Sequence, residues 1–464
     1  MHVLMLGWEF PPFITGGLGT ACQGLTKAMD RRGMRVTFVL PKAVGADQAG
    51  HVNILGPDNA NIPPDVRAAM MDPTGRTPLP DTAGIFERTQ FIGVEAGFAH
   101  PYQTSAGPQA VGQWLTEAKR AAAGTAASAG LGTGARAVAP PDGPAGAQDY
   151  GADLVAQVER YAYFCLAATR NIDFDVIHAH DWMTYPAGMM IAGLTGKPLV
   201  VHVHSTEFDR SGIHVNQRVY DIERRGMHAA RRAIAVSQLT KNICVSRYGM
   251  PDHLVEVIYN GVDFEPTQRD RSVGIRSKDK IVLYFGRITM QKGPEYFIAA
   301  AKRVLEVMDN VKFVVAGSGD MARQMIEMAA NLGIGHKVLF TGFLRGDDIN
   351  RVFALADLYV MPSVSEPFGI APLEAMSHDV PVLISKSSGV SEVLTHALKT
   401  DFWDIDDMAN KIIAVLRHPP LSETLREHGA FEVRGATWDG AAQRCEQVYQ
   451  AVINEMSAPP AVHP

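Results

Sequence analysis

The segment LYVMPSVSEPFGIAPLEAM, residues 358–376, decides the fold class of the chain. Its first five residues form a short apolar run that is typical of a buried strand, and Pro372 suits the first turn of a following helix. Glu366 lies in the loop between these two elements, and Glu374 lies in the first turn of the helix. A strand that leads directly into a helix is half of a βαβ unit, which predicts a parallel, wound sheet.

The same alternation extends in both directions from this segment. Stretches with helical spacing separate apolar runs that predict strands, at residues 3–6, 35–40, 175–180, 198–205, 233–237, 255–260, 281–286, 311–317, 338–343, 358–362 and 381–385. A polar stretch at 268–280 interrupts the pattern and indicates a linker between two sheets. We therefore expect an α/β protein with two Rossmann-like, doubly wound domains. Because parallel sheets bind ligands at the carboxyl ends of their strands, the ligand site should lie in a central cleft that both domains face.

The boundaries follow from this pattern. We predict an N-terminal domain over residues 1–267, a C-terminal domain over 268–436, and a terminal segment, 437–464, that contains a further helix. Residues 106–150 are rich in Ala, Gly and Pro and offer little bulk to bury, which predicts a mobile surface insertion.

Composition and charge narrow the class of protein. The chain has 464 residues, 46% of them hydrophobic, and a net charge of −6, which favours neither nucleic acid nor an anionic membrane as partner. No apolar run approaches the length of a membrane span, so we expect no transmembrane helix. Peripheral contact with a membrane stays open. We expect a cytoplasmic protein. We also expect neither disulfides nor a zinc knuckle, because the cysteines are scattered along the sequence: Cys22, Cys165, Cys244 and Cys445.

The loop at 363–370 is the first candidate site. The backbone N–H groups of Phe368, Gly369 and Ile370 lie at the start of the predicted helix, where an anionic group such as a diphosphate can bind. The structural alternative is that Glu374 only complements the helix dipole and that Glu366 is merely exposed.

Two further loops carry groups suited to phosphate. Arg287 and Lys292 follow the predicted strand 281–286, where two cations can neutralise a leaving diphosphate, although an ordinary ion pair would also explain them. Gly16 and Gly17 open the first predicted helix and let the backbone approach a phosphate. Gly17 and Gly19 also come close to a dinucleotide fingerprint, but the second predicted strand ends without the acid that would bind a ribose.

Two H-x-H sequences support a rival interpretation. His178 and His180, like His202 and His204, follow period-two spacing and so point to one face of a sheet. With Asp181 as a partner they could hold a metal, which would make the protein a metal-dependent hydrolase. Hydrogen-bonded strand histidines are the structural alternative, with His204 the best placed to face a cleft. The D-x-D at 404–406 precedes a predicted helix, which favours capping over metal binding.

Taken together, these motifs resemble the retaining glycosyltransferases of the GT-B fold, family 4, with the glycogen and starch synthases nearby. The matching pieces occur in the family's order: WEFPP (8–12), GGLG (16–19), HAHDW (178–182), NGVD (260–263), FGRITMQKG (285–293), AGSGD (316–320), TGF (341–343) and EPFGIAPLE (366–374).

The resemblance implies a role for each candidate residue. Glu374 would bind the ribose hydroxyls, and Glu366 and His204 would lie against the transferred sugar. Arg287 and Lys292 would hold the diphosphate together with backbone N–H groups at Gly16, Gly17 and 368–370. The base would lie against the backbone at Gly342, Phe343 and Leu344, and the last helix, 437–453, would cross back to the first domain.

The function that this resemblance implies is transfer of a hexose, most simply glucose, from a UDP-, ADP- or GDP-sugar to an acceptor hydroxyl, with no metal and no further cofactor. Bacterial glycogen synthases carry lysine two residues before the paired glycines, where this chain has Ile14. The acceptor therefore stays open between an α-glucan and a lipid-linked or other glycan. A catalytically silent sugar-nucleotide-binding protein is the remaining alternative.

Overall fold

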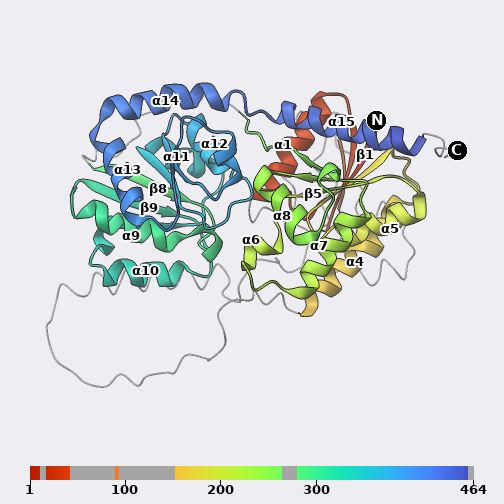
Figure 1. The fold of residues 1–464 in the computed structure, drawn as a ribbon, viewed down its shortest axis with the longest axis horizontal. Coiled ribbons are helices and arrows are strands. Elements are labelled where there is room, and N and C mark those ends of the chain that lie inside the picture. Colours follow the sequence, from red (N-terminus) through yellow and green to blue (C-terminus); the bar gives the residue numbers. More distant parts are fainter. Residues whose placement is uncertain (11–16, 42–88, 94–151, 264–278, 458–464) are drawn as a thin grey trace, which may run out of the picture.

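The computed structural model describes residues 1–10, 17–41, 89–93, 152–263 and 279–457. Gly16, Ile14 and the predicted insertion at 106–150 lie outside the described residues. Figure 1 shows two α/β lobes side by side, with the C-terminal helix on the lobe that contains the N-terminus.

The first lobe is built on a parallel sheet of seven described strands in the order β3-β2-β1-β4-β5-β6-β7. The sequence order turns back at β1, so the sheet is doubly wound, as predicted. Its strands are β1 (His2–Leu6), β2 (Arg35–Leu40), β3 (Thr89–Gly93), β4 (Val176–His180), β5 (Leu199–Val203), β6 (Arg232–Ala235) and β7 (Val255–Val257).

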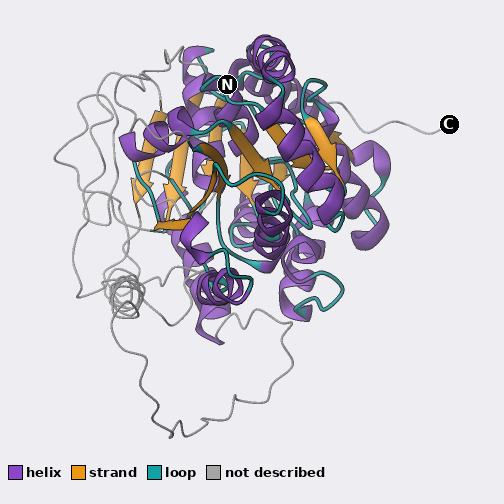
Figure 2. Cartoon of the chain, turned by 90° about the vertical axis from the view of Figure 1, so that its left-hand side faces the viewer, coloured by secondary structure: helices purple, strands orange, loops and turns teal. Residues whose placement is uncertain are grey.

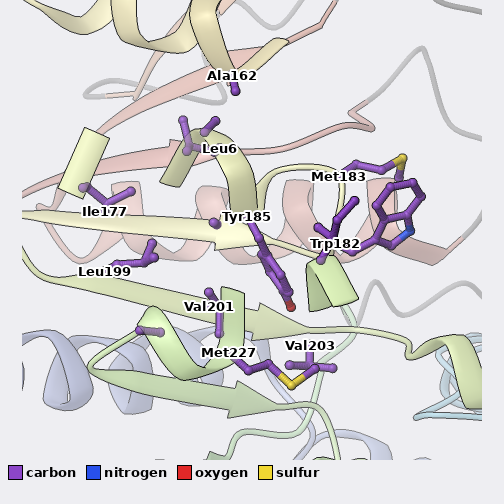
Figure 3. Packing of buried hydrophobic residues seen from close by; sticks show 14 of the residues in the cluster. Leu6, Ala162, Ile177, Trp182, Met183, Tyr185, Leu199, Val201, Val203 and Met227 are labelled. Carbon is purple, nitrogen blue, oxygen red and sulfur yellow. The ribbon is translucent and has the colours of Figure 1, made fainter. Parts of the chain in front are cut away.

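Alternate strand residues enter two separate cores on the two faces of this sheet. Leu6, Ile177 and Val201 join one core, which Figure 3 shows packed with Trp182 and Tyr185. That face is covered by helices α4 (Ala152–Thr169), α5 (Tyr185–Thr195), α7 (Gln217–Ala229) and α8 (Gln238–Tyr248). The other face is covered by α1 (Gly17–Arg31) and α15 (Trp438–Ser457). A short helix, α6 (Glu207–Ser211), follows β5.

The second lobe repeats this plan with six described strands in the order β10-β9-β8-β11-β12-β13. Figure 2, in which the two lobes overlap, shows strands in the interior with helices around them. The strands are β8 (Lys280–Phe285), β9 (Val311–Ala316), β10 (Val338–Gly342), β11 (Leu358–Met361), β12 (Val382–Ser385) and β13 (Leu398–Thr400). Helices α9 (Pro294–Leu305), α10 (Ala322–Asn331) and α13 (Ile405–Arg417) cover one face, and α11 (Asp347–Leu355) and α12 (Ala371–Ser377) cover the other.

The chain returns to the first lobe at its end. Helix α14 (Pro419–Val433) lies on the second lobe, whereas α15 lies along α1. Trp438 packs so closely on Gly24 that a Cβ there would lie 2.2 Å from the indole. Ion pairs at the surface reinforce this contact, namely Arg31 with Asp439, Arg32 with Glu446 and Arg232 with Glu455.

Most predicted elements are present, with ends shifted by a few residues. Strand β3 was not predicted, because the sequence around it, at 42–105, is rich in Pro, Asp and Gly and shows no clear period. Asp404 caps α13 by accepting the N–H of Asp407, which confirms capping over metal binding at 404–406. Within the described ranges, no helix combines the length and hydropathy that crossing a bilayer requires.

The packing of α15 can be tested at Trp438, which is 3% exposed. We expect Trp438→Ala to lower the free energy of unfolding by about 3–5 kcal/mol, because it leaves a cavity against Gly24. Urea denaturation followed by circular dichroism measures this change. Trp403→Ala is the matched control, since Trp403 is 59% exposed, and should cost about 1 kcal/mol or less. Equal effects of the two substitutions would contradict the packing argument.

Candidate functional site

The loops after β8 and β11 meet through one ion pair. Lys292 Nζ lies 2.5 Å from Glu366 Oε2, and the Ser363 hydroxyl donates to the same carboxylate oxygen at 3.2 Å. Glu366 is only 7% exposed, so its carboxylate depends on these two donors. The structure therefore brings together two predicted site residues that are 74 positions apart in the sequence.

Backbone contacts hold the two loops in this register. The carbonyl of Gln291 accepts the N–H of Val364 at 3.0 Å and that of Ser365 at 3.4 Å. Gly293 has φ of 60° and packs so tightly that a Cβ would lie 2.2 Å from the carbonyl oxygen of Pro362. Only glycine meets both conditions without strain. The position of Lys292 is thus set by the backbone and does not rest on its ion pair alone.

The segment 368–370 presents free backbone donors. In the part of the chain that the structure describes, the N–H groups of Phe368, Gly369 and Ile370 donate no hydrogen bond to protein. The N–H groups of Leu373 and Glu374, in contrast, both donate to the carbonyl of Ile370. The donors available to an anion therefore include the loop that leads into α12.

Glu374 occupies the start of α12, where it is half-buried. Burial raises the pKa of its carboxyl from 4.5 to about 7. This carboxyl is therefore partly protonated near neutral pH until a ligand supplies donors that favour its charged form. The Glu374 carboxyl can therefore ionise when the hydroxyls of a ligand donate hydrogen bonds to it.

The first lobe reaches this site through α6. Asp209 Oδ1 accepts a hydrogen bond of 2.7 Å from the hydroxyl of Ser365, the residue next to Glu366. Its other oxygen caps α6 by accepting from the N–H and hydroxyl of Thr206. The same carboxylate therefore fixes the start of α6 in one lobe and the 363–370 loop of the other.

A second contact between the lobes lies at α8. The Glu392 carboxylate accepts hydrogen bonds of 2.8 Å from the N–H groups of Gln238 and Leu239, at the amino end of this helix. The Thr240 hydroxyl donates to the carbonyl of Pro367 at 3.4 Å. The two lobes thus meet along the loop that contains Glu366.

The four histidines form one stacked column on the face that α1 and α15 cover. His178 and His180 stack with ring centroids 4.3 Å apart, and His202 and His204 stack at 4.1 Å. His178 Nδ1 is hydrogen-bonded to the hydroxyl of Tyr449 from α15. These contacts confirm the expectation that each H-x-H pair faces one side of the sheet.

The stacking does not suit a divalent metal. Nitrogen atoms of His178, His180 and His202 lie within 4.8 Å of one another. However, the lone pair of an imidazole lies in the plane of its ring, and these rings are tilted by only 17–28°. Nearly parallel lone pairs do not converge on a tetrahedral ion. Asp181, the possible partner of the H-x-H pairs in such a metal site, instead accepts from the backbone N–H groups of His204 and Ser205.

The remaining predicted residues lie around this junction. Arg287 lies two residues after the end of β8, and the hydroxyl of Tyr284 donates to its carbonyl. Burial raises the pKa of Tyr284 well above its ordinary value. The charge of Glu366 raises this pKa further and that of Arg287 lowers it, so both residues act on the same buried hydroxyl. Gly17 begins α1, and a Cβ there would meet no described atom within 4 Å.

The segment predicted to bind the base, residues 342–344, begins at the last residue of β10 and continues into the following loop. Gly342 has φ of 76°, Phe343 is 51% exposed, and Leu344 is half-buried. The guanidinium of Arg345 lies 5.3 Å from the centre of the Phe343 ring. An exposed aromatic ring with a cation over it offers a surface on which a planar base can stack.

Sequence reasoning missed the residues that hold the site in place, namely Asp209, Ser363, Ser365 and the carbonyl of Gln291. Thr206 and Asp209 follow the T-x-x-D pattern of a capping box, a signal that could have placed α6. The contact of Asp209 with Ser365 had no local signal, because it joins residues 156 positions apart.

Comparison with known proteins identifies the class. The model for glycosyl transferases group 1 matches residues 266–430, and the model for glycosyltransferase family 4 matches 150–266. The model for the starch synthase catalytic domain matches 2–123. An uncharacterised glycosyltransferase of Methanocaldococcus jannaschii is 28% identical over 98% of this chain and 100% of its own length.

Solved structures share the fold across both lobes. Sucrose-phosphate synthase of Thermosynechococcus elongatus aligns with a TM-score of 0.68 at 17% identity, over 98% of this chain and all of its own. Anabaena HepE in complex with UDP-glucose aligns at 0.63 and 18% identity, over 97% of this chain and all of its own.

These two lobes define an enzyme of the glycosyltransferase class with the GT-B fold. All three matching models describe glycosyltransferases or starch synthases, and together they span residues 2–123 and 150–430, so the chain is a GT-B glycosyltransferase related to family 4 and to the starch synthases.

The raised pKa of Glu374 predicts a dependence of stability on pH. Because the folded protein holds this proton up to about pH 7 while the unfolded chain releases it near 4.5, stability falls as pH rises through this window. Glu374→Gln cannot ionise, so we expect the variant to gain stability relative to the parent between pH 4.5 and 8. Urea denaturation without ligand measures the difference. Glu423→Gln, an exposed change on α14, is the control, and a pH-independent difference for Glu374→Gln would contradict the assignment.

Proposed function

We propose that the protein transfers a hexose from a nucleoside-diphosphate sugar to an acceptor hydroxyl, with retention at the anomeric carbon. The observation that carries this proposal is the pair of Lys292 with Glu366, placed where the loops after β8 and β11 meet. The hydrogen bond of Asp209 to Ser365 brings the other lobe to the same point.

The chemical difficulty is the charge that develops when the bond between sugar and phosphate breaks. Negative charge grows on the leaving diphosphate, and positive charge grows on the sugar ring. Lys292, Arg287 and the free N–H groups at 368–370 would stabilise the diphosphate, together with the backbone at Gly16 and Gly17. When a diphosphate binds Lys292, Glu366 loses part of its partner and becomes available to the sugar.

The donor would lie on the second lobe. Glu374 would accept from the ribose hydroxyls, which favours its ionised form, and the base would lie against 342–344. Glu366 and His204 would contact the transferred hexose. HepE shares the fold, and its structures contain UDP and glucose, which supports a nucleoside-diphosphate sugar as the donor. UDP-glucose is therefore the first donor to test, followed by ADP- and GDP-hexoses.

The acceptor would be a glycan. The match of residues 2–123 to the starch synthase catalytic domain favours an α-glucan. Ile14, which stands where bacterial glycogen synthases have lysine, favours the alternative of a lipid-linked or other glycan. Product analysis with both acceptor classes separates them.

The cations can be tested by substitution. We expect Arg287→Ala and Lys292→Ala each to lower kcat at least ~100-fold, because each removes a charge that faces the leaving diphosphate. The measurement is steady-state transfer from the best donor found by thermal shift. Arg323→Ala on α10 removes an exposed cation elsewhere and should leave kcat unchanged. A near-normal rate for Lys292→Ala would remove the pair from the mechanism.

The proposed reaction needs no divalent metal, because side-chain cations and backbone N–H groups take that role. We expect the rate to stay within about twofold after EDTA treatment and dialysis, since no ion is proposed to touch the diphosphate. Zinc or magnesium added back should not raise it. Loss of activity on chelation, with recovery on adding zinc, would instead favour a metal site at the H-x-H pairs.

A further inference from the structure

Two hydrogen bonds join rings within the histidine column, and two of its fully buried ring nitrogens have no partner among the described residues. His180 Nδ1 lies 2.9 Å from His204 Nε2, and His178 Nε2 lies 3.2 Å from His202 Nδ1. The Nε2 atoms of His180 and His202 are buried and make no hydrogen bond with any described residue. Both side chains are almost completely buried, at 0% and 2% exposed. Each orphan atom limits where the ring proton can be.

All four rings are neutral near pH 7. Burial is the largest cause of the lowered pKa of each ring, and the pKa of His178 and that of His204 are lowered to about 3. The pKa values of His180 and His202 are also lowered by burial and by the neighbouring rings. A neutral imidazole has one N–H donor and one bare nitrogen acceptor, so each ring must adopt one of two tautomers.

The orphan nitrogen decides the tautomer of His180. A proton on Nε2 would bury an N–H group with no acceptor, whereas a proton on Nδ1 is satisfied by His204. His180 therefore donates from Nδ1. His204 must then accept at Nε2, which leaves its single proton on Nδ1.

The second pair follows the same rule independently. Since Nε2 of His202 has no partner, its proton lies on Nδ1 and is donated to His178 Nε2. His178 then carries its proton on Nδ1 and donates it to the Tyr449 hydroxyl. Burial raises the pKa of Cys445 to about 12, and a hydrogen bond with the Tyr449 hydroxyl opposes this rise, as a donor to the sulfur would. The donors thus run in one direction without conflict, which supports the rule used for His180.

We propose that His180 is a positioning residue that holds His204 in the Nδ1–H tautomer, so that His204 offers a hydrogen-bond donor to an oxygen of the bound sugar. His204 is half-buried, and its Nδ1 makes no hydrogen bond with the described residues. Asp181 fixes the same residue through its backbone, by accepting the N–H of His204 at 2.7 Å. The tautomer assignment rests on the burial and hydrogen bonds of the four rings, whereas the sugar as its target rests on the proposed function.

The tautomer can be read directly from the unmodified protein. We expect long-range ¹H–¹⁵N correlation spectra of ¹⁵N-histidine-labelled protein to show His204 protonated at Nδ1, with its signals identified by their loss in His204→Asn. In His180→Leu, which cannot donate, the Nε2–H form of His204 should appear. A protonated Nε2 on His204 in the parent protein overturns the inference, whatever the activity.

Matched substitutions test the consequence for catalysis. The amide nitrogen of Asn occupies nearly the place of Nδ1, whereas that of Gln occupies nearly the place of Nε2. We therefore expect His204→Asn to keep a kcat/KM about tenfold above that of His204→Gln. Likewise, His180→Asn should retain more activity than His180→Leu.

The two readouts separate the inference from the proposed function. Equal or reversed rates for the Asn and Gln variants overturn the donor role of His204, even if the spectrum agrees. If the spectrum agrees but no sugar nucleotide is turned over with any acceptor, the proposed function fails. In that case the claim that His204 serves a sugar fails with it, while the tautomer assignment stands.

Discussion

The parallel winding of both sheets is the constraint on which the rest of the structure depends. Every strand of a parallel sheet ends at the same edge, and the loops that follow β5, β8 and β11 contact one another where the lobes meet. The winding brings the loops that contain Lys292 and Glu366 to the same edge. Had either sheet been antiparallel, hairpin turns would have placed successive loops at opposite edges, and no shared site could form.

Placing charge at such a junction requires support from buried groups. Arg210, only 4% exposed, lies between Glu207 and Glu223, and Glu223 also accepts from the hydroxyl of Tyr248. Breaking one member would leave the others buried and unpaired, which costs several kcal/mol. The network therefore fixes α6, and α6 carries Asp209 to Ser365. The position of the loop beside Glu366 thus depends on a polar cluster in the opposite lobe.

How much the sequence could predict depended on whether the signal was local. Strand and helix periods, the capping role of Asp404 and the common face of the H-x-H pairs depend on neighbours a few residues away. The pairing of Lys292 with Glu366 could be expected only as proximity, through the rule for strand ends. The contact of Asp209 with Ser365 and that of His178 with Tyr449 join distant segments, so no period in the sequence signals them.

The last helix couples the two lobes in a way that neither sheet does. In the sequence, α15 follows the last helix of the second lobe, but its buried side chains pack in the core of the first lobe. It also closes the face on which the histidines lie, and the hydroxyl of Tyr449 is hydrogen-bonded to His178 there. Without α15, the column would be open to water, and His180 and His202 could exchange tautomers by bonding to solvent. The helix that holds the lobes together therefore also keeps the histidine column dry, and a dry column is what gives each ring a single tautomer.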